Sequence, residues 1–140
     1  MAGIKRTTAD KWFSDCIRER ADWTCQSCKT EYTPPARGLE CAHIIGRANK
    51  AVRWDELNAL ALCTGCHMHY TGNPLEFVQL VERELGTGAR EILQEKARGI
   101  FKYNKAAIKE ATEHYKDQYK KMREKRMNGF VGWLEFESFQ

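Results

Sequence analysis

Residues 41–71 decide the fold, and they read CAHIIGRANKAVRWDELNALALCTGCHMHYT. Two short apolar runs, 39–45 and 59–62, predict strands, and Gly46 ends the first of them. The polar segment between the runs predicts a loop, and the sequence CTGCH at 63–67 predicts a turn that starts a short helix. The stretch therefore predicts two strands followed by a helix, within an α+β fold.

Two Cys-x2-Cys pairs, separated by 34 residues, frame this unit. Two such pairs in a chain without secretory features are typical of zinc sites, where each pair turns both thiolates towards the metal. Four thiolates leave no open coordination position, so the predicted zinc is structural. The alternative is four buried or redox-active cysteines, although the strand–helix context of a thioredoxin-like site is missing. The predicted ligands are Cys25, Cys28, Cys63 and Cys66.

Between the two pairs, a histidine, an asparagine and a second histidine follow in the order His43, Asn58, His67. The segments that carry this pattern are Ala42-His43-Ile44-Ile45, Asn58-Ala59-Leu60-Ala61-Leu62-Cys63 and Cys63-x2-Cys66-His67. With the four cysteines, they resemble the HNH endonucleases, the ββα-metal nuclease family, over roughly residues 20–71. A weaker resemblance to the phage NinG recombination proteins extends over the flanking helices to about residue 123, and it predicts a phage or prophage source.

The resemblance implies a ββα-metal core clamped by the structural zinc, and a second, catalytic divalent ion such as Mg²⁺ or Mn²⁺. It implies that His43 is the general base that activates water, that His67 binds the catalytic ion and that Asn58 orients His43. A histidine suits the base because its ordinary pKa of about 6.5 leaves it mostly neutral near pH 7. Taken singly, the three residues also have ordinary interpretations: a packed histidine, a histidine of the zinc site and a turn asparagine.

The second ligand of the catalytic ion stays open. Many family members carry an acidic residue or a histidine directly before the base, where this chain has Ala42. Glu40 and Cys41 are the nearby candidates, and in a regular strand only Cys41 shares a face with His43. Cys41 can equally be a core residue.

The charge pattern suits a nucleic-acid partner, because the net charge is +4 and basic residues gather in 101–127. Without a base-reading helix, we expect the protein to nick DNA with little sequence specificity. His69 lies about 200° from His67 around a helix, so we expect it to contact solvent or phosphate instead of the same metal. The predicted DNA contacts are Arg47, Lys50, Arg53, His69, Lys116, Lys120 and Arg123.

Length and composition predict one domain outside the membrane. The 140 residues are 42% hydrophobic and 30% charged, as in ordinary globular domains. No apolar run approaches the ~20 residues of a membrane span, and the N-terminus lacks the apolar core of a signal peptide. We therefore expect a cytoplasmic protein, in the host cytoplasm if it is encoded by a phage.

Helices are predicted on both sides of the core, within one domain that spans 1–127. Cys16 lies on the apolar stripe of the first helix, which favours a core position for its thiol. Asn73 to Glu76 has the composition of a capping box at a helix start. The apolar segment 128–140 is expected to dock on the body or on a partner chain. The predicted segments are helix 8–21, the core 20–72, and the flanking helices of 74–126, namely 74–86, 88–98 with Ile92 and Leu93 inward, and 103–126.

Two other functions stay open. One is a structure-selective recombination nuclease of the NinG type, acting on branched DNA, or a nuclease acting on RNA. The other is a zinc-stabilised DNA-binding module without catalysis. A single HNH site cuts one strand per event, so cleavage of both strands would need a dimer or two events. The expected state is a monomer, or a homodimer formed through the apolar C-terminal segment.

Overall fold

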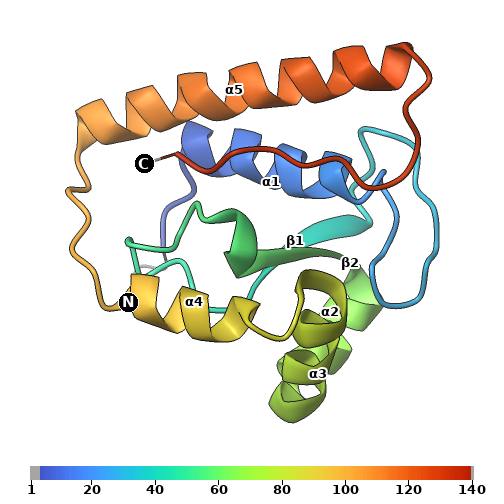
Figure 1. The fold of residues 1–140 in the computed structure, drawn as a ribbon, viewed down its shortest axis with the longest axis horizontal. Coiled ribbons are helices and arrows are strands. Elements are labelled where there is room, and N and C mark those ends of the chain that lie inside the picture. The colour runs from blue at the N-terminus through green and yellow to red at the C-terminus, as the bar shows by residue number, and fades with distance from the viewer. Residues whose placement is uncertain (1–3, 140) are drawn as a thin grey trace.

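The computed structural model describes residues 4–139, which form an α+β structure with a two-stranded antiparallel sheet and five α-helices. The elements are α1 (Thr8–Arg20), β1 (Leu39–His43), the 3-10 turn η1 (Glu56–Asn58), β2 (Ala59–Cys63), α2 (Thr64–Thr71), α3 (Pro74–Leu85), α4 (Ala89–Ala97) and α5 (Lys105–Met127). In Figure 1, α5 lies along one side of the molecule, α1 lies beneath it, and the sheet lies between α1 and the smaller helices. No helix within residues 4–139 is both long and apolar enough to cross a membrane.

The sheet confirms both predicted strands and sets the two ends of the site. β1 and β2 pair from Leu39 opposite Cys63 to His43 opposite Ala59. His43 therefore lies at the loop end of the sheet, and Cys63 lies at the end that leads into α2. The side chains of residues 59–62 are all fully buried, which explains why β2 reads as a continuous apolar run.

Helix α1 forms the centre of the core, and it begins as predicted. The Thr7 side chain accepts the Asp10 N–H, and the Asp10 carboxylate accepts the Thr7 N–H, which together form a capping box. Phe13, Cys16 and Ile17 are each at most 1% exposed between the sheet and α5. The core position predicted for the Cys16 thiol is confirmed.

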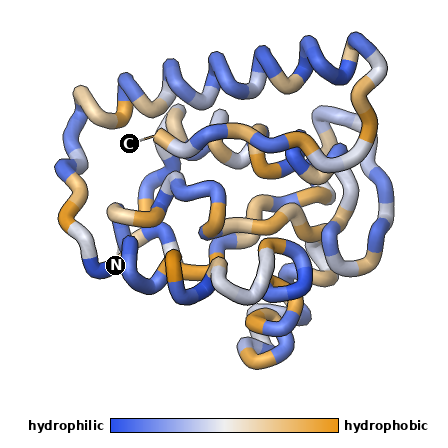
Figure 2. Tube along the Cα trace, viewed as in Figure 1, coloured by the Kyte–Doolittle hydropathy of each residue, from blue (hydrophilic) through white to orange (hydrophobic). Residues whose placement is uncertain are grey.

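The C-terminal segment packs on the body, and in Figure 1 its trace runs along α1. Leu134 and Phe136 are each only 4% exposed. The Leu134 N–H donates to the carbonyl of Arg20 at 3.1 Å, and the Phe139 N–H donates to the hydroxyl of Tyr115 at 2.8 Å. Figure 2 shows hydrophobic residues on this segment and on the strands, whereas α5 is mostly hydrophilic along its length.

Two local predictions for the C-terminal helices are wrong. Asn73 precedes α3 but makes no capping bond, and its side-chain amide donates to the His69 carbonyl at 2.7 Å instead. Glu76 does not close a capping box either, because its carboxylate binds the His69 ring. In α4, Leu93 is buried, but Ile92 is 51% exposed because only one face of this short helix rests on the body.

Candidate functional site

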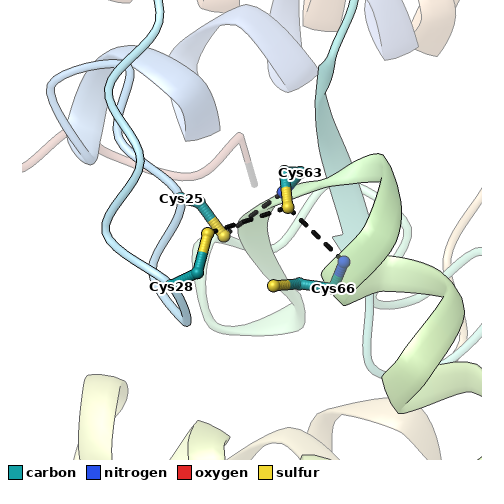
Figure 3. Close-up of side chains that lie close together, drawn as sticks. All are labelled: Cys25, Cys28, Cys63 and Cys66. Carbon is teal, nitrogen blue, oxygen red and sulfur yellow. Dashed lines mark hydrogen bonds between the residues drawn. The ribbon is translucent and has the colours of Figure 1, made fainter.

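The four cysteines of the two Cys-x2-Cys pairs meet in one cluster (Figure 3). Cys25 and Cys28 come from the turn after α1, whereas Cys63 ends β2 and Cys66 lies in the first turn of α2. Their four sulfur atoms all lie within 4.8 Å of one another. Within residues 4–139, this is the only group of three or more histidine, cysteine or acidic side chains close enough to share a metal ion.

Backbone donors around the cluster favour charged sulfur. The Cys63 N–H donates to the Cys25 sulfur at 3.3 Å, and the Cys66 N–H donates to the Cys63 sulfur at 3.4 Å. Hydrogen bonds from Thr30 lower the pKa of Cys28 to about 6, whereas burial raises the pKa of Cys66 to about 12. A bound metal deprotonates its thiol ligands, and four sulfurs are a donor set that zinc prefers. The cluster could therefore hold a metal such as zinc.

A cleft of about 720 Å³ lies between β1, α1 and the start of the loop that follows the strand. Four arginines line it, and the only carboxylates in its walls are those of Asp10 and Glu40. Because Asp10 already pairs with buried Arg53, with 2.6 Å between nitrogen and oxygen, the cleft keeps an excess of positive charge. The lining arginines are Arg6, Arg18, Arg37 and Arg47, and both His43 and His67 line the same cleft.

His43 has a defined tautomer. Its Nε2 lies 3.1 Å from the carbonyl oxygen of Arg53, and a carbonyl can only accept a hydrogen bond. The hydrogen is therefore on Nε2, and in the neutral ring Nδ1 carries a free lone pair. Burial, together with the positive charge of Arg47, lowers the pKa of His43 below its ordinary value. The ring is consequently a neutral base near pH 7.

His67 is bound to an acidic side chain. Its Nδ1 lies 2.8 Å from a carboxylate oxygen of Glu40, whose other oxygen accepts the Thr64 hydroxyl at 3.3 Å. A carboxylate on one ring nitrogen fixes the orientation of the ring and leaves the other nitrogen for a ligand. Glu40 is therefore an outer partner that orients the His67 ring, and in this arrangement it is not itself a second ligand of an ion on the other ring nitrogen.

Neither of the other two positions considered for that ligand is assigned by the structure. Ala42 is fully buried and has no ligating side chain. Cys41 lines the cleft, and burial raises the pKa of its thiol to about 12. Glu40 and His43 point to opposite faces of β1, as strand alternation predicts. Both side chains nevertheless line the cleft.

Asn58 closes the loop between the two strands. Its Oδ1 accepts the Ile45 N–H at 2.7 Å, and its amide donates to the carbonyls of Ile45 at 2.8 Å and Val52 at 2.9 Å. The side chain is fully buried. These three bonds hold the loop that follows His43, so Asn58 acts on that histidine through the backbone.

Replacing Asn58 should therefore destabilise the protein. Asn58→Ala leaves three buried backbone groups without partners, and we expect a loss of roughly 3 kcal/mol in the free energy of unfolding. Urea denaturation measures this loss. Asn58→Asp should be no better, because it sets a carboxylate oxygen against two carbonyls. Asn73→Ala is the matched control on an exposed asparagine, and a loss as large as that of Asn58→Ala would contradict the role of the loop.

Of the three loop residues predicted to contact phosphate, only Arg47 lines the cleft. Arg53 is 3% exposed and donates to both oxygens of Asp10, so the prediction that it contacts DNA is wrong. Its role is to fix the carbonyl that binds His43. Lys50 lies over the ring of Tyr103, 4.7 Å from its centre, and is exposed outside the cleft.

The predicted contacts on the later helices also lie apart from the cleft. Lys116 and Lys120 border a separate, largely apolar hollow of about 540 Å³ beside Trp12. Arg123 binds the fully buried carboxylate of Glu19 at 2.7 Å, while its side chain stays 43% exposed, so its contact with DNA remains a prediction. His69 is exposed and binds Glu76 at 2.7 Å, away from His67, as its helical position predicts.

Sequence reasoning missed the wall of the cleft that α1 supplies. Asp10, Ser14 and Arg18 are four residues apart, so they share one face of this helix, and all three line the cleft. That polar spacing was a usable signal, opposite the apolar stripe. Arg6 and Arg37 lie outside regular elements and carried no comparable signal.

Comparisons with known proteins identify no relative from which a function could be inferred. No family model, no curated protein and no solved structure matches this chain. The grounds for a function are therefore two features on the chain itself: the four-cysteine cluster, and the arginine-lined cleft that contains His43 and His67.

Proposed function

We propose that the protein is a metal-dependent DNA endonuclease of the HNH type, which hydrolyses phosphodiester bonds. The observation that carries the proposal is that His43 and His67, from different elements, line one arginine-rich cleft. Phosphodiester hydrolysis needs a base for the attacking water and positive charge around the phosphate. The cleft offers both, and the order of two strands and a helix around it supports the same type of nuclease.

His43 is the proposed general base. Because the Nε2 hydrogen is bound to the Arg53 carbonyl, Nδ1 is the atom that takes the proton from water. The lowered pKa keeps this nitrogen unprotonated near neutral pH. The ion pair between Arg53 and Asp10 holds the carbonyl in place, so the orientation of the base depends on a buried contact in α1.

His67 is the proposed ligand of the catalytic divalent ion. The residues fit such an ion in part, since Glu40 holds one ring nitrogen of His67 and the other is left free, and imidazole is a ligand that Mn²⁺ and similar ions accept. Within residues 4–139 no group of three or more ligating side chains forms around His67, so water and the substrate phosphate would supply most of the remaining positions. A bound divalent ion would stabilise the negative charge that develops on the leaving oxygen.

The four-cysteine cluster is the proposed site of a structural zinc. A tetrahedral site of four thiolates is closed to water, which separates its role from that of the cleft. It would connect the turn after α1 to the end of β2. Because His67 directly follows the ligand Cys66, it would also fix the position of the helix that presents this histidine.

Arginines in the cleft favour contacts with the nucleic-acid backbone over reading of bases. Phosphate contacts position a strand and carry no sequence information. Arg47, next to His43 in the cleft wall, is the best-placed residue for the scissile phosphate. We therefore expect nicking with little sequence preference.

A plasmid-nicking assay tests the proposal. Zinc-loaded protein is incubated with supercoiled DNA, with no added divalent ion or with Mg²⁺ or Mn²⁺, and conversion to the relaxed circle is measured. We expect conversion only with added ion. DNA binding without conversion under any of these conditions would instead identify a zinc-stabilised binding module.

The pH dependence of cleavage should follow His43. Only the neutral ring accepts a proton, so the rate should fall about tenfold per pH unit below the His43 pKa, which lies under the ordinary value of about 6.5. Above that pKa the rate should level off, so we expect a plateau at pH 7. Single-turnover nicking between about pH 5 and 8 measures it, and a rate that rises as the pH falls would exclude His43 as the base.

A further inference from the structure

One wall of the cleft brings two guanidinium groups to the same serine. Arg6 and Arg18 each donate from Nη2 to the Ser14 hydroxyl oxygen, at 3.1 Å and 3.2 Å. That hydroxyl donates to the carbonyl of Lys11 at 2.8 Å. All three converging side chains line the cleft.

The positive charge of this cluster is only partly balanced. Arg18 binds Asp15 at 2.6 Å, but Asp15 also binds Lys11 at 2.7 Å. In the described part of the chain, no carboxylate lies within ion-pair distance of Arg6. Two guanidiniums held on one neutral oxygen repel each other, and an anion between them would remove that repulsion.

The position of the cluster relates it to the proposed catalytic residues. Asp10 and Ser14 lie one turn apart on α1, which is about 5.4 Å along the helix axis. Asp10 marks the His43 end of the cleft, because Arg53 binds Asp10 with its guanidinium and His43 with its carbonyl. The Ser14 cluster therefore lies one helix turn further along the same cleft.

We propose that Arg6, Ser14 and Arg18 form a second anion subsite, which holds a non-scissile phosphate of the substrate strand. The assignment of the anion to the substrate rests on the proposed function. Guanidinium groups bind phosphate oxygens through paired N–H donors, and Arg18 is already held by Asp15 in a fixed position. The preferred substrate is then a polynucleotide with consecutive phosphates, rather than any single phosphodiester.

Binding tests the subsite without reference to activity. The probe is a fluorescent duplex oligonucleotide, and anisotropy without divalent ions gives its Kd at several salt concentrations. We expect Arg6→Ala to raise the Kd about tenfold and to lower the log–log salt slope by about 0.9, the value for one lost phosphate contact. Arg6 is exposed, so its replacement should not disturb folding. Arg18→Ala should act in the same direction, with its thermal transition checked because it also loses Asp15.

Lys109→Ala is the matched control, because it removes one positive charge at an exposed residue of α5 that lines neither the cleft nor the hollow beside Trp12. We expect its Kd and salt slope to stay near the wild-type values. An equal effect of Lys109→Ala and Arg6→Ala would mean that only the net charge of the protein matters, and it would overturn the subsite. An unchanged Kd in Arg6→Ala would overturn it as well.

Cleavage separates the subsite from the proposed nuclease. The second substrate is bis(p-nitrophenyl) phosphate, which has a single phosphate. For Arg6→Ala, the loss of kcat/KM on the duplex should exceed the loss on this small diester at least tenfold. Equal losses would contradict a second phosphate site. If the wild-type protein cleaves neither substrate while Arg6→Ala still weakens duplex binding as expected, the nuclease proposal fails and the anion subsite stands.

Discussion

His43→Ala should lower the rate of DNA nicking by roughly two to four orders of magnitude, the usual contribution of a general base. The physical reason is the loss of Nδ1, the one ring atom left free to accept a proton while Nε2 is bound to the Arg53 carbonyl. The replacement should leave the cysteine cluster and the arginines of the cleft in place. DNA binding and metal content should therefore stay near their wild-type values. Single-turnover nicking at saturating divalent ion measures the rate.

His69→Ala is the control for this prediction. His69 is exposed and its ring binds Glu76, so it takes no part in the cleft. We expect no more than a few-fold loss of rate. If His69→Ala were inactive while His43→Ala cleaved like the wild type, the active site would have to be rebuilt around the second histidine of α2.

Local patterns predicted the parts of the molecule that lie on neighbouring stretches of chain. The two Cys-x2-Cys pairs predicted a cluster, since each pair is a tight turn that can only direct its sulfurs inward. The apolar runs predicted β1 and β2 because a buried strand needs consecutive apolar residues. Asn58 could be singled out because its order between the histidines is itself a pattern.

The walls of the cleft could not be predicted in the same way, because they depend on tertiary contacts. Arg53 reads like its loop neighbour Arg47, and only the approach of Asp10 from α1 shows that it is buried and paired. In the sequence, Arg123 is one more basic residue on a basic helix, but in the structure it pairs with Glu19, 104 positions earlier. Glu40 was separated from the site by strand alternation, whereas the start of α2 brings His67 to it.

Charge counts along the sequence pointed to a different element from the arginine-lined cleft. The basic segment 101–127 has the largest local excess of charge, but its helix packs on α1 through Trp12 and Tyr119, on the side away from Ser14. The cleft draws single arginines from four separate parts of the chain. These arginines come together only through tertiary packing, so no single stretch of the sequence could predict their cluster.

Cys25→Ser should abolish tight metal binding and, with it, the cooperative folding of the core. Cys25 is fully buried, and its N–H donates to the Thr30 carbonyl, which holds it in the turn after α1. A metal bound by its sulfur would connect this turn to the end of β2. In a structural zinc site the free energy of metal binding is also free energy of folding, because the ligands do not meet in the unfolded chain. We expect the wild-type protein to carry one zinc and the variant to carry none. We also expect the thermal transition of Cys25→Ser to be broad or lost.

Cys41→Ser is the matched control, since it makes the same chemical change at a thiol that lines the cleft outside the cluster. It should keep the zinc and a sharp thermal transition. Metal content by atomic absorption and unfolding by circular dichroism measure both variants. Should Cys25→Ser retain its zinc and melt at the wild-type temperature, the four cysteines would not form a structural metal site. The positioning of His67 would then have to come from the packing of α2 against the sheet and α3 alone.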